Sequence, residues 1–121
     1  MPPDLPGSQP GIDIHSTRPG VVVVALRGEH DLAGKDELSA ALGHACAVEP
    51  LVVVDLSECT FIDSTVIAAL VSSYALVGEE GRRLALLIPQ TDGIVARTAE
   101  LSGLRALVPT FASLDEALSG H

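Results

Sequence analysis

The sequence predicts an α/β fold in which one mixed, mostly parallel sheet of about five strands is covered by about four helices. Short aliphatic runs alternate along the chain with segments whose apolar residues recur at helical spacing. A turn signal joins the first two runs directly, which predicts a hairpin and makes the sheet mixed. The 121 residues, 47% of them hydrophobic, suffice for one domain and leave no room for a second.

The predicted elements follow one another as β-β-α-β-α-β-α-β-α. They cover residues 12–15, 21–26, 33–46, 51–54, 65–77, 84–88, 92–101, 106–108 and 113–118. Residues 1–11 include four prolines and two glycines and have little apolar surface to bury. We therefore expect a disordered tail over residues 1–11 and a single domain over residues 12–121.

Local patterns predict each of the first five elements. The first strand alternates apolar and polar residues, the second is a β-branched run, and Arg18-Pro19-Gly20 between them is a turn signal. A polar connection leads to the first helix, which ends at Glu49-Pro50. The third strand is aliphatic, ends in Asp55 and is followed by a loop. Gly78 and Gly81 bracket the end of the second helix.

The last four elements have clear start and stop signals. Pro89 stops the fourth strand, Asp92 is the predicted N-cap of the third helix, and Gly103 is placed to end that helix. Residues 106–108 form a short apolar run ahead of a proline, which is typical of an edge strand. Ser113 begins a Ser-x-x-Glu capping box, which predicts a short terminal helix.

Charge excludes several classes of function. The chain has 16 acidic and 7 basic residues, a formal net charge of −9. Nucleic acid binding needs clustered Lys and Arg, and Arg82-Arg83 is the only adjacent basic pair. An acidic surface also disfavours anionic lipid and suits a partner with a basic docking face. The sequence shows neither a signal peptide nor an apolar stretch of membrane-spanning length, so we expect no membrane association and a cytoplasmic location.

The residues that could bind metal or form disulfides are few. His15, His30, His44 and His121 are scattered and match no metal-binding spacing, so we expect neither a metal nor another cofactor. Cys46 and Cys59 are too few for a disulfide framework. We expect two buried, reduced thiols, with a regulatory disulfide between them as the open alternative.

Asp63 and Ser64 stand where the loop after a buried strand meets an apolar helix. In open α/β sheets this carboxyl edge is where ligands and partners bind. Both residue types are also common N-caps, so a purely structural role is the alternative. The apolar positions of the helix are typical of a face that packs on the sheet. We therefore expect an exposed rim made of Thr65, Ala68, Ala69 and Ser72.

Three segments together resemble the STAS-domain anti-sigma-factor antagonists. Phe61-Ile62-Asp63-Ser64-Thr65 is similar to the phosphorylation segment of that family. Gly28-Glu29-His30-Asp31 resembles its Gly-Glu-Leu-Asp turn, and Leu101-Ser102-Gly103-Leu104 resembles its late Ser-Gly-Leu segment. The likeness covers residues 12–118. The family usually has glycines where this chain has Val66 and Ala68, so we expect a stiffer helix start that crowds an approaching partner.

The resemblance implies a single STAS domain that binds a protein and is not an enzyme. It implies that the unmodified form binds an anti-sigma factor, a serine kinase using ATP and magnesium, and so releases the sigma factor. Phosphorylation of Ser64 would abolish that binding. The implied partner-binding residues are Glu29, Asp31, Asp63, Ser64, Thr65 and Ala68. We expect a monomer or weak dimer.

Two other functions are alternatives to this one. The first is a non-phosphorylated STAS subunit of a larger assembly, such as a sensory scaffold or a lipid-transport complex. The second is an acyl-transfer hydrolase, for which Ser64 and His30 are present but the Gly-x-Ser-x-Gly pattern is absent. His30-Asp31 fits a solvated turn better, so the hydrolase is poorly supported.

Overall fold

A computed structural model describes residues 11–119 and confirms the alternation of strands and helices. The strands are β1 (Gly11–Arg18), β2 (Val21–His30), β3 (Leu51–Ile62), β4 (Arg83–Leu87) and β5 (Thr110–Phe111). The helices are α1 (Lys35–Val48), α2 (Ser64–Glu79), α3 (Ile94–Leu101), α4 (Leu104–Leu107) and α5 (Leu114–Ser119), and a 3₁₀ turn, η1 (Leu32–Gly34), precedes α1.

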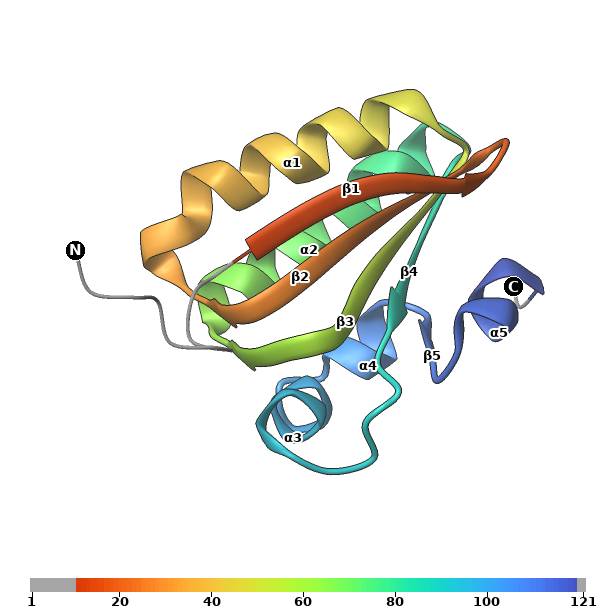
Figure 1. Cartoon of the computed structure of the whole chain (residues 1–121). Helices are drawn as coiled ribbons and strands as arrows, with labels where there is room; N and C mark the ends of the chain where they lie inside the picture. The colour runs from red at the N-terminus through yellow and green to blue at the C-terminus, as the bar shows by residue number, and fades with distance from the viewer. Residues whose placement is uncertain (1–10, 120–121) are drawn as a thin grey trace.

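The five strands form one sheet in chain order, β1-β2-β3-β4-β5 (Figure 1). β1 is antiparallel to β2, and the other three neighbouring pairs are parallel. The predicted mixed, mostly parallel sheet is therefore confirmed. The parallel arrangement brings the carboxyl ends of β2 and β3 to the same end of the molecule, where α1 and α2 begin (Figure 1).

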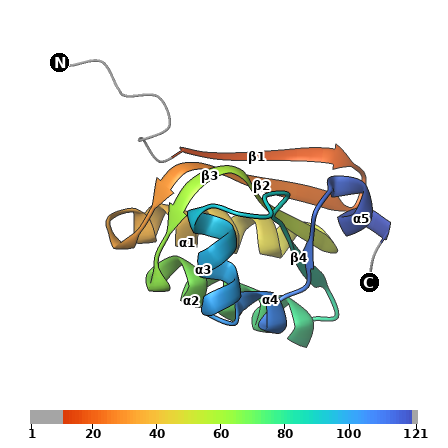
Figure 2. The ribbon, with the colours of Figure 1, turned by 90° about the horizontal axis from the view of Figure 1, so that it is seen from below.

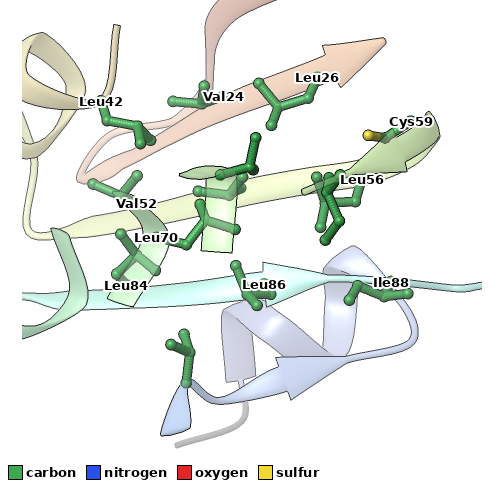
Figure 3. Close-up of a cluster of buried hydrophobic side chains, with 14 of the residues drawn as sticks. Val24, Leu26, Leu42, Val52, Leu56, Cys59, Leu70, Leu84, Leu86 and Ile88 are labelled. Carbon is green, nitrogen blue, oxygen red and sulfur yellow. The ribbon is translucent and has the colours of Figure 1, made fainter. Parts of the chain in front are cut away.

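Both faces of the sheet are buried against helices. The larger cluster joins the sheet to α1, α2, α3 and α4, which gather on one side of β2 and β3 (Figure 2). Apart from Cys46 and Cys59, its buried side chains are aliphatic, as Figure 3 shows for Leu26, Leu70 and Leu86. A smaller cluster on the other face packs the sheet against α5. Neighbouring valines of β2 pack into the clusters on opposite faces of the sheet, because side chains alternate along a strand. Continuous apolar runs are expected of strands buried on both faces.

β2 and β3 are longer than predicted. β2 continues to His30 and β3 to Ile62, where the sequence predicted a polar connection and a loop. β4 pairs with β3 only as far as Asp55, so the end of β3 is paired with β2 alone. One side of this extension is exposed to solvent, so it contains polar residues such as Glu58. The extension therefore lacks the continuous apolar run that would have predicted a strand.

The segment after β4 also differs from the prediction. α3 begins at Ile94 and Gly93, with φ +96°, is its N-cap, so Asp92 does not cap it. Residues 106–107 are helical and Val108 is a buried C-cap, so the predicted edge strand is wrong. Gly103, with φ +82°, ends α3 and lets the one-turn α4 follow it. α4 raises the number of α-helices in residues 11–119 to five, against about four predicted.

β1 begins at Gly11, a residue that the predicted tail included, and residues 1–10 of that tail lie outside the described part. The predicted capping box is confirmed, because the Glu116 N–H donates to Ser113 Oγ at 3.2 Å. None of the helices in residues 11–119 combines the length and the hydropathy that crossing a bilayer requires.

The two cysteines are free and buried, as predicted. Cys46 lies in the last turn of α1, and Cys59 lies near the end of β3. Burial raises the pKa of the Cys46 thiol, with a smaller opposing effect of the Arg82 guanidinium. Burial also raises the pKa of Cys59, opposed in part by the backbone of Phe61. Both thiols are therefore protonated, poorly reactive groups near neutral pH.

Candidate functional site

Asp63 caps α2 and leaves the next side chain free. Its Oδ1 accepts the N–H groups of Thr65 and Val66, at 3.0 and 3.1 Å. Ser64 is exposed at the first helical position, and its hydroxyl makes no hydrogen bond to another residue in the described part of the chain. Of the two candidate N-caps, Asp63 and Ser64, Asp63 is therefore the one that caps α2. Ser64 is available for contact with another molecule.

The end of β2 lies beside Asp63. Glu29 pairs with Phe61, and the other Asp63 oxygen, Oδ2, accepts the N–H of Leu32 at 3.1 Å. Asp31 accepts the N–H of Ala33 at 3.0 Å and so caps η1. Glu29 and Asp31 are exposed and Asp63 is partly exposed. The structure therefore brings the predicted acidic residues to the end of the domain where Ser64 lies.

His30 does not lie in a solvated turn, and that prediction is wrong. Only 2% of the residue is exposed. Its Nε2 lies 3.0 Å from the carbonyl oxygen of Arg27 and 3.2 Å from that of Gly11, so the ring donates to β1 and β2 backbone. Because β2 continues to this residue, alternation along the strand turns His30 inward and Glu29 outward.

A groove of about 660 Å³ runs between α1 and α2 and has Ser64 at one end. The α2 side chains that line it are Ser64, Thr65, Ala68, Ala69, Ser72, Ser73 and Leu76. These include all four predicted rim residues. Ala68 and Ser72 are exposed, whereas Thr65 and Ala69 are only partly exposed, so the predicted exposed rim is confirmed for two of its four residues. Two leucines that line the groove, Leu32 and Leu76, are 65% and 52% exposed, so it offers apolar surface to a partner.

The α1 wall of the groove was not predicted from the sequence. It consists of Lys35, Ser39, Leu42 and Gly43. Ser39 and Gly43 are four residues apart and therefore lie on one face of α1. Small residues on an exposed helix face are a weak signal, because such positions are common in helices that contact only solvent.

The residues that replace the family glycines differ in their exposure. Val66 is completely buried and belongs to the larger core cluster, so it does not reach a partner. Ala68 is exposed and lines the groove. The expectation that Val66 crowds an approaching partner is therefore wrong. The departure from the family pattern adds one methyl group to the groove.

Comparison with known proteins supports the resemblance. A family model described as "Mlab, STAS domain" matches residues 15–109. The chain is similar to an anti-sigma factor antagonist from Mycobacterium paratuberculosis, with 29% identity, a TM-score of 0.76 and 92% of each chain covered. Comparison with curated protein sequences gave no match.

More distant structures share the fold. The anti-sigma factor antagonist SpoIIAA in its unphosphorylated form is 19% identical, with a TM-score of 0.72 over 89% of this chain and 93% of that one. A sulfate transporter family protein from Wolinella succinogenes is 20% identical, with a TM-score of 0.66 over 87% of each chain. The fold therefore occurs in proteins of different function, and the site has to identify the function. The match to the family model spans most of the sequence, and the chain belongs to the STAS domain family.

Proposed function

We propose that the chain is an anti-sigma-factor antagonist that docks an anti-sigma factor through the end of the domain around Ser64, and that phosphorylation of Ser64 ends the complex. The observation that carries this proposal is that Ser64 is exposed at one end of the α1–α2 groove and that its hydroxyl does not act as the cap of α2. The similar protein from Mycobacterium paratuberculosis is an anti-sigma factor antagonist, and SpoIIAA has structures in unphosphorylated and phosphorylated forms. The chain acts as a binding protein in this proposal, not as an enzyme.

The docking surface consists of the α2 side of the groove and the acidic side chains next to it. Thr65 and Ala68 supply small, closely approachable surface, and Leu32 supplies an exposed apolar contact. Glu29, Asp31 and Asp63 give the surface a negative charge that suits a basic partner. A partner matched to this surface makes both apolar and charged contacts, as protein interfaces usually do.

The γ-phosphoryl group of ATP would pass to Ser64 Oγ, with the hydroxyl proton leaving to a base on the kinase and ADP as the other product. The exposure of Ser64 is what lets a kinase reach that hydroxyl. Magnesium neutralises the phosphate charge in such transfers and belongs to the kinase site. The partner therefore supplies the catalytic groups, and this chain supplies the acceptor.

The phosphate would remain on the surface. The N–H groups of Thr65 and Val66 already donate to Asp63, so they are not free for the phosphate. A phosphoserine adds about −1.5 to −2 charges at neutral pH, beside a carboxylate that is already there. The helix N-terminus tolerates this charge, so the domain stays folded. The partner meets new bulk and charge, and each 1.4 kcal/mol lost weakens binding about tenfold.

The test combines intact mass and binding. The protein is incubated with its anti-sigma factor and magnesium ATP, and we expect one added phosphate in the wild type and in Ser72→Ala, but none in Ser64→Ala. Ser72 lines the same groove and is exposed, so Ser72→Ala is the matched control. In titrations with the anti-sigma factor, Ser64→Ala should bind like the unmodified protein and Ser64→Asp at least about tenfold more weakly.

Phosphate on Ser64→Ala, or equal affinity of Ser64→Ala and Ser64→Asp, would refute the switch. A chain that gains no phosphate and stays in one complex whether or not ATP is present would instead fit the subunit of a larger assembly. In this proposal the chain works in the cytoplasm, where sigma factors act, and is a monomer or weak dimer.

A further inference from the structure

A second pocket lies at the other end of the sheet from Ser64, where α2 ends and β4 begins. Its volume is about 340 Å³, within the range of roughly 300–1,000 Å³ that small-molecule pockets cover. Gly78 of α2, Leu84 of β4 and Phe111 of β5 belong to its walls. No residue lines both this pocket and the groove at Ser64, so the two sites are separate.

The pocket exists because β5 is too short to cover β4. β5 pairs only with Leu86 and Leu87, and Leu86 donates its N–H to the carbonyl of Pro109 at 2.8 Å. Within residues 11–119, no strand lies beside the preceding part of the β4 edge. The N–H of Arg83 points toward β3, where it donates to the carbonyl of Pro50 at 2.8 Å. The N–H of Leu84, like that of Leu86, therefore points to the β5 side of β4, and Leu84 also lines the pocket.

The lining combines aromatic walls with hydrogen-bond donors. Tyr74 and Phe111 are two of the three aromatic residues in the whole chain, and both line this pocket. Arg82 and Arg83, the only adjacent basic pair of an acidic protein, line it as well. The side chain of Arg82 is paired with Glu80, whereas Arg83 makes no ion pair within residues 11–119. No carboxylate is among the described residues that line the pocket.

We propose that this pocket binds a small apolar carboxylic acid as a free ligand. The apolar body would lie against Tyr74 and Phe111. The carboxylate would accept hydrogen bonds from the Arg83 guanidinium and the Leu84 N–H, because both are donors at the pocket and a charged acceptor makes such bonds stronger. A neutral ligand of the same shape would fill the same apolar space without this charged contact.

Tyr74 makes the binding directly measurable. It is the only tyrosine, and the chain has no tryptophan, so the intrinsic fluorescence of the protein comes from inside this pocket. The probes are cyclohexylacetate and its neutral analogue cyclohexylacetamide, neither of which absorbs at the excitation wavelength. We expect both to change the Tyr74 emission saturably, with the acid bound about tenfold more tightly, since a charge-assisted hydrogen bond is typically worth at least that factor.

Two variants and one control test the assignment. Arg83→Gln should reduce the affinity for the acid to that for the amide. Gly78→Leu should abolish binding of both, because a Cβ at Gly78 meets nothing within 4 Å and the longer side chain would fill the pocket. Arg105→Gln removes a basic residue of α4 outside the pocket and should leave both affinities unchanged.

Amide shifts of isotope-labelled protein give a second readout. The acid should shift the Leu84 and Gly78 amide signals, and Gly78→Leu should keep the wild-type spectrum elsewhere, which shows that it folds. Three results would overturn the proposal: no saturable response to either probe, equal affinity of the wild type for the acid and the amide, or unchanged binding by Gly78→Leu.

Discussion

At the scale of single residues, Asp63 joins two segments that are 31 residues apart in the chain. One carboxylate oxygen holds the first turn of α2, and the other holds the N–H of Leu32. This double use explains why the cap is an aspartate and not a serine, since a hydroxyl has a single oxygen to place. It also frees the Ser64 hydroxyl, which a helix start would otherwise use for its own N–H groups.

Asp63→Ala should therefore lower the free energy of unfolding by about 1–2 kcal/mol, the usual range for the loss of an N-cap. Asp63→Asn is the matched variant, because asparagine caps helices about as well and its amide oxygen can accept the N–H groups of Thr65 and Val66. Its amide nitrogen cannot accept the N–H of Leu32, so a smaller loss is expected. Denaturant unfolding measures both variants, and a stable Asp63→Ala would mean that the cap contributes nothing.

Cys59 gives the stability a pH dependence. Burial raises the pKa of the Cys59 thiol in the folded protein above its unfolded value. The stability that the protonated thiol contributes is fully present below that unfolded pKa and is lost as the pH rises through the folded pKa.

The comparison with Cys59→Ala isolates this effect, because other titrating groups are common to both proteins. At pH 7 the variant should be less stable by about 1 kcal/mol, typical of a core truncation. The difference in the free energy of unfolding should shrink between pH 8 and pH 10. A difference that stays constant over this range would contradict the raised pKa.

At the scale of elements, prediction succeeded where a pattern was strong and local. The β-branched runs of β2 and β3 and the capping box before α5 predict their elements directly. It failed where tertiary structure overrides local preference. The polar end of β3 is a strand because β2 pairs with it, and no local signal in Ser57 or Glu58 indicates that. The apolar composition of residues 106–108 suits either a strand or a short helix. The left-handed conformation of Gly103 starts a new helical turn directly before them, and residues 106–107 are therefore helical.

The extension of β2 depends on a glycine. Gly28 has φ +76°, and the register between β2 and β3 shifts between Gly28 and Glu29. Left-handed backbone costs other residues roughly 1–2 kcal/mol. This irregularity positions Glu29 and Asp31 beside the start of α2.

Gly28→Ala should therefore lower the free energy of unfolding by about 1–2 kcal/mol and weaken anti-sigma factor binding. Gly43→Ala is the control, since Gly43 lies inside α1 with open space around its Cβ position, and alanine there should stabilise the fold by up to about 1 kcal/mol. Thermal unfolding of the two variants should shift in opposite directions. A Gly28→Ala variant as stable as the wild type would show that the left-handed conformation is not required.

At the scale of the whole molecule, some parts of the site could be predicted from the sequence and others could not. Ser64 and Asp63 follow from capping chemistry and family resemblance, and the structure shows which of them is the cap. The groove depends on how far α1 lies from α2, which no local pattern states. The apolar pocket depends on the two-residue length of β5 and was likewise not predictable.

The charge distribution also differs between the two ends of the domain. Near the start of α2, the exposed or partly exposed acids are Glu29, Asp31, Asp36, Glu37 and Asp63, against the single base Lys35. At the other end, Arg82 and Arg83 stand next to Glu79 and Glu80 and largely balance them. The acids near the start of α2 outnumber the bases there, so the proposed docking surface is negatively charged and can attract a basic partner before contact.

Association with the anti-sigma factor should therefore be sensitive to salt, and dissociation much less so. The Debye length falls from about 10 Å at 0.1 M ionic strength to about 3 Å at 1 M, which screens attraction at a distance but affects close contacts little. Stopped-flow mixing should show an association rate constant that drops by about tenfold over this range. Glu29→Gln should lower the rate at low salt, whereas Glu79→Gln, at the far end of α2, should change it less. Equal effects of the two substitutions, or a rate independent of salt, would mean that the acidic end does not guide the partner and that the apolar groove alone selects it.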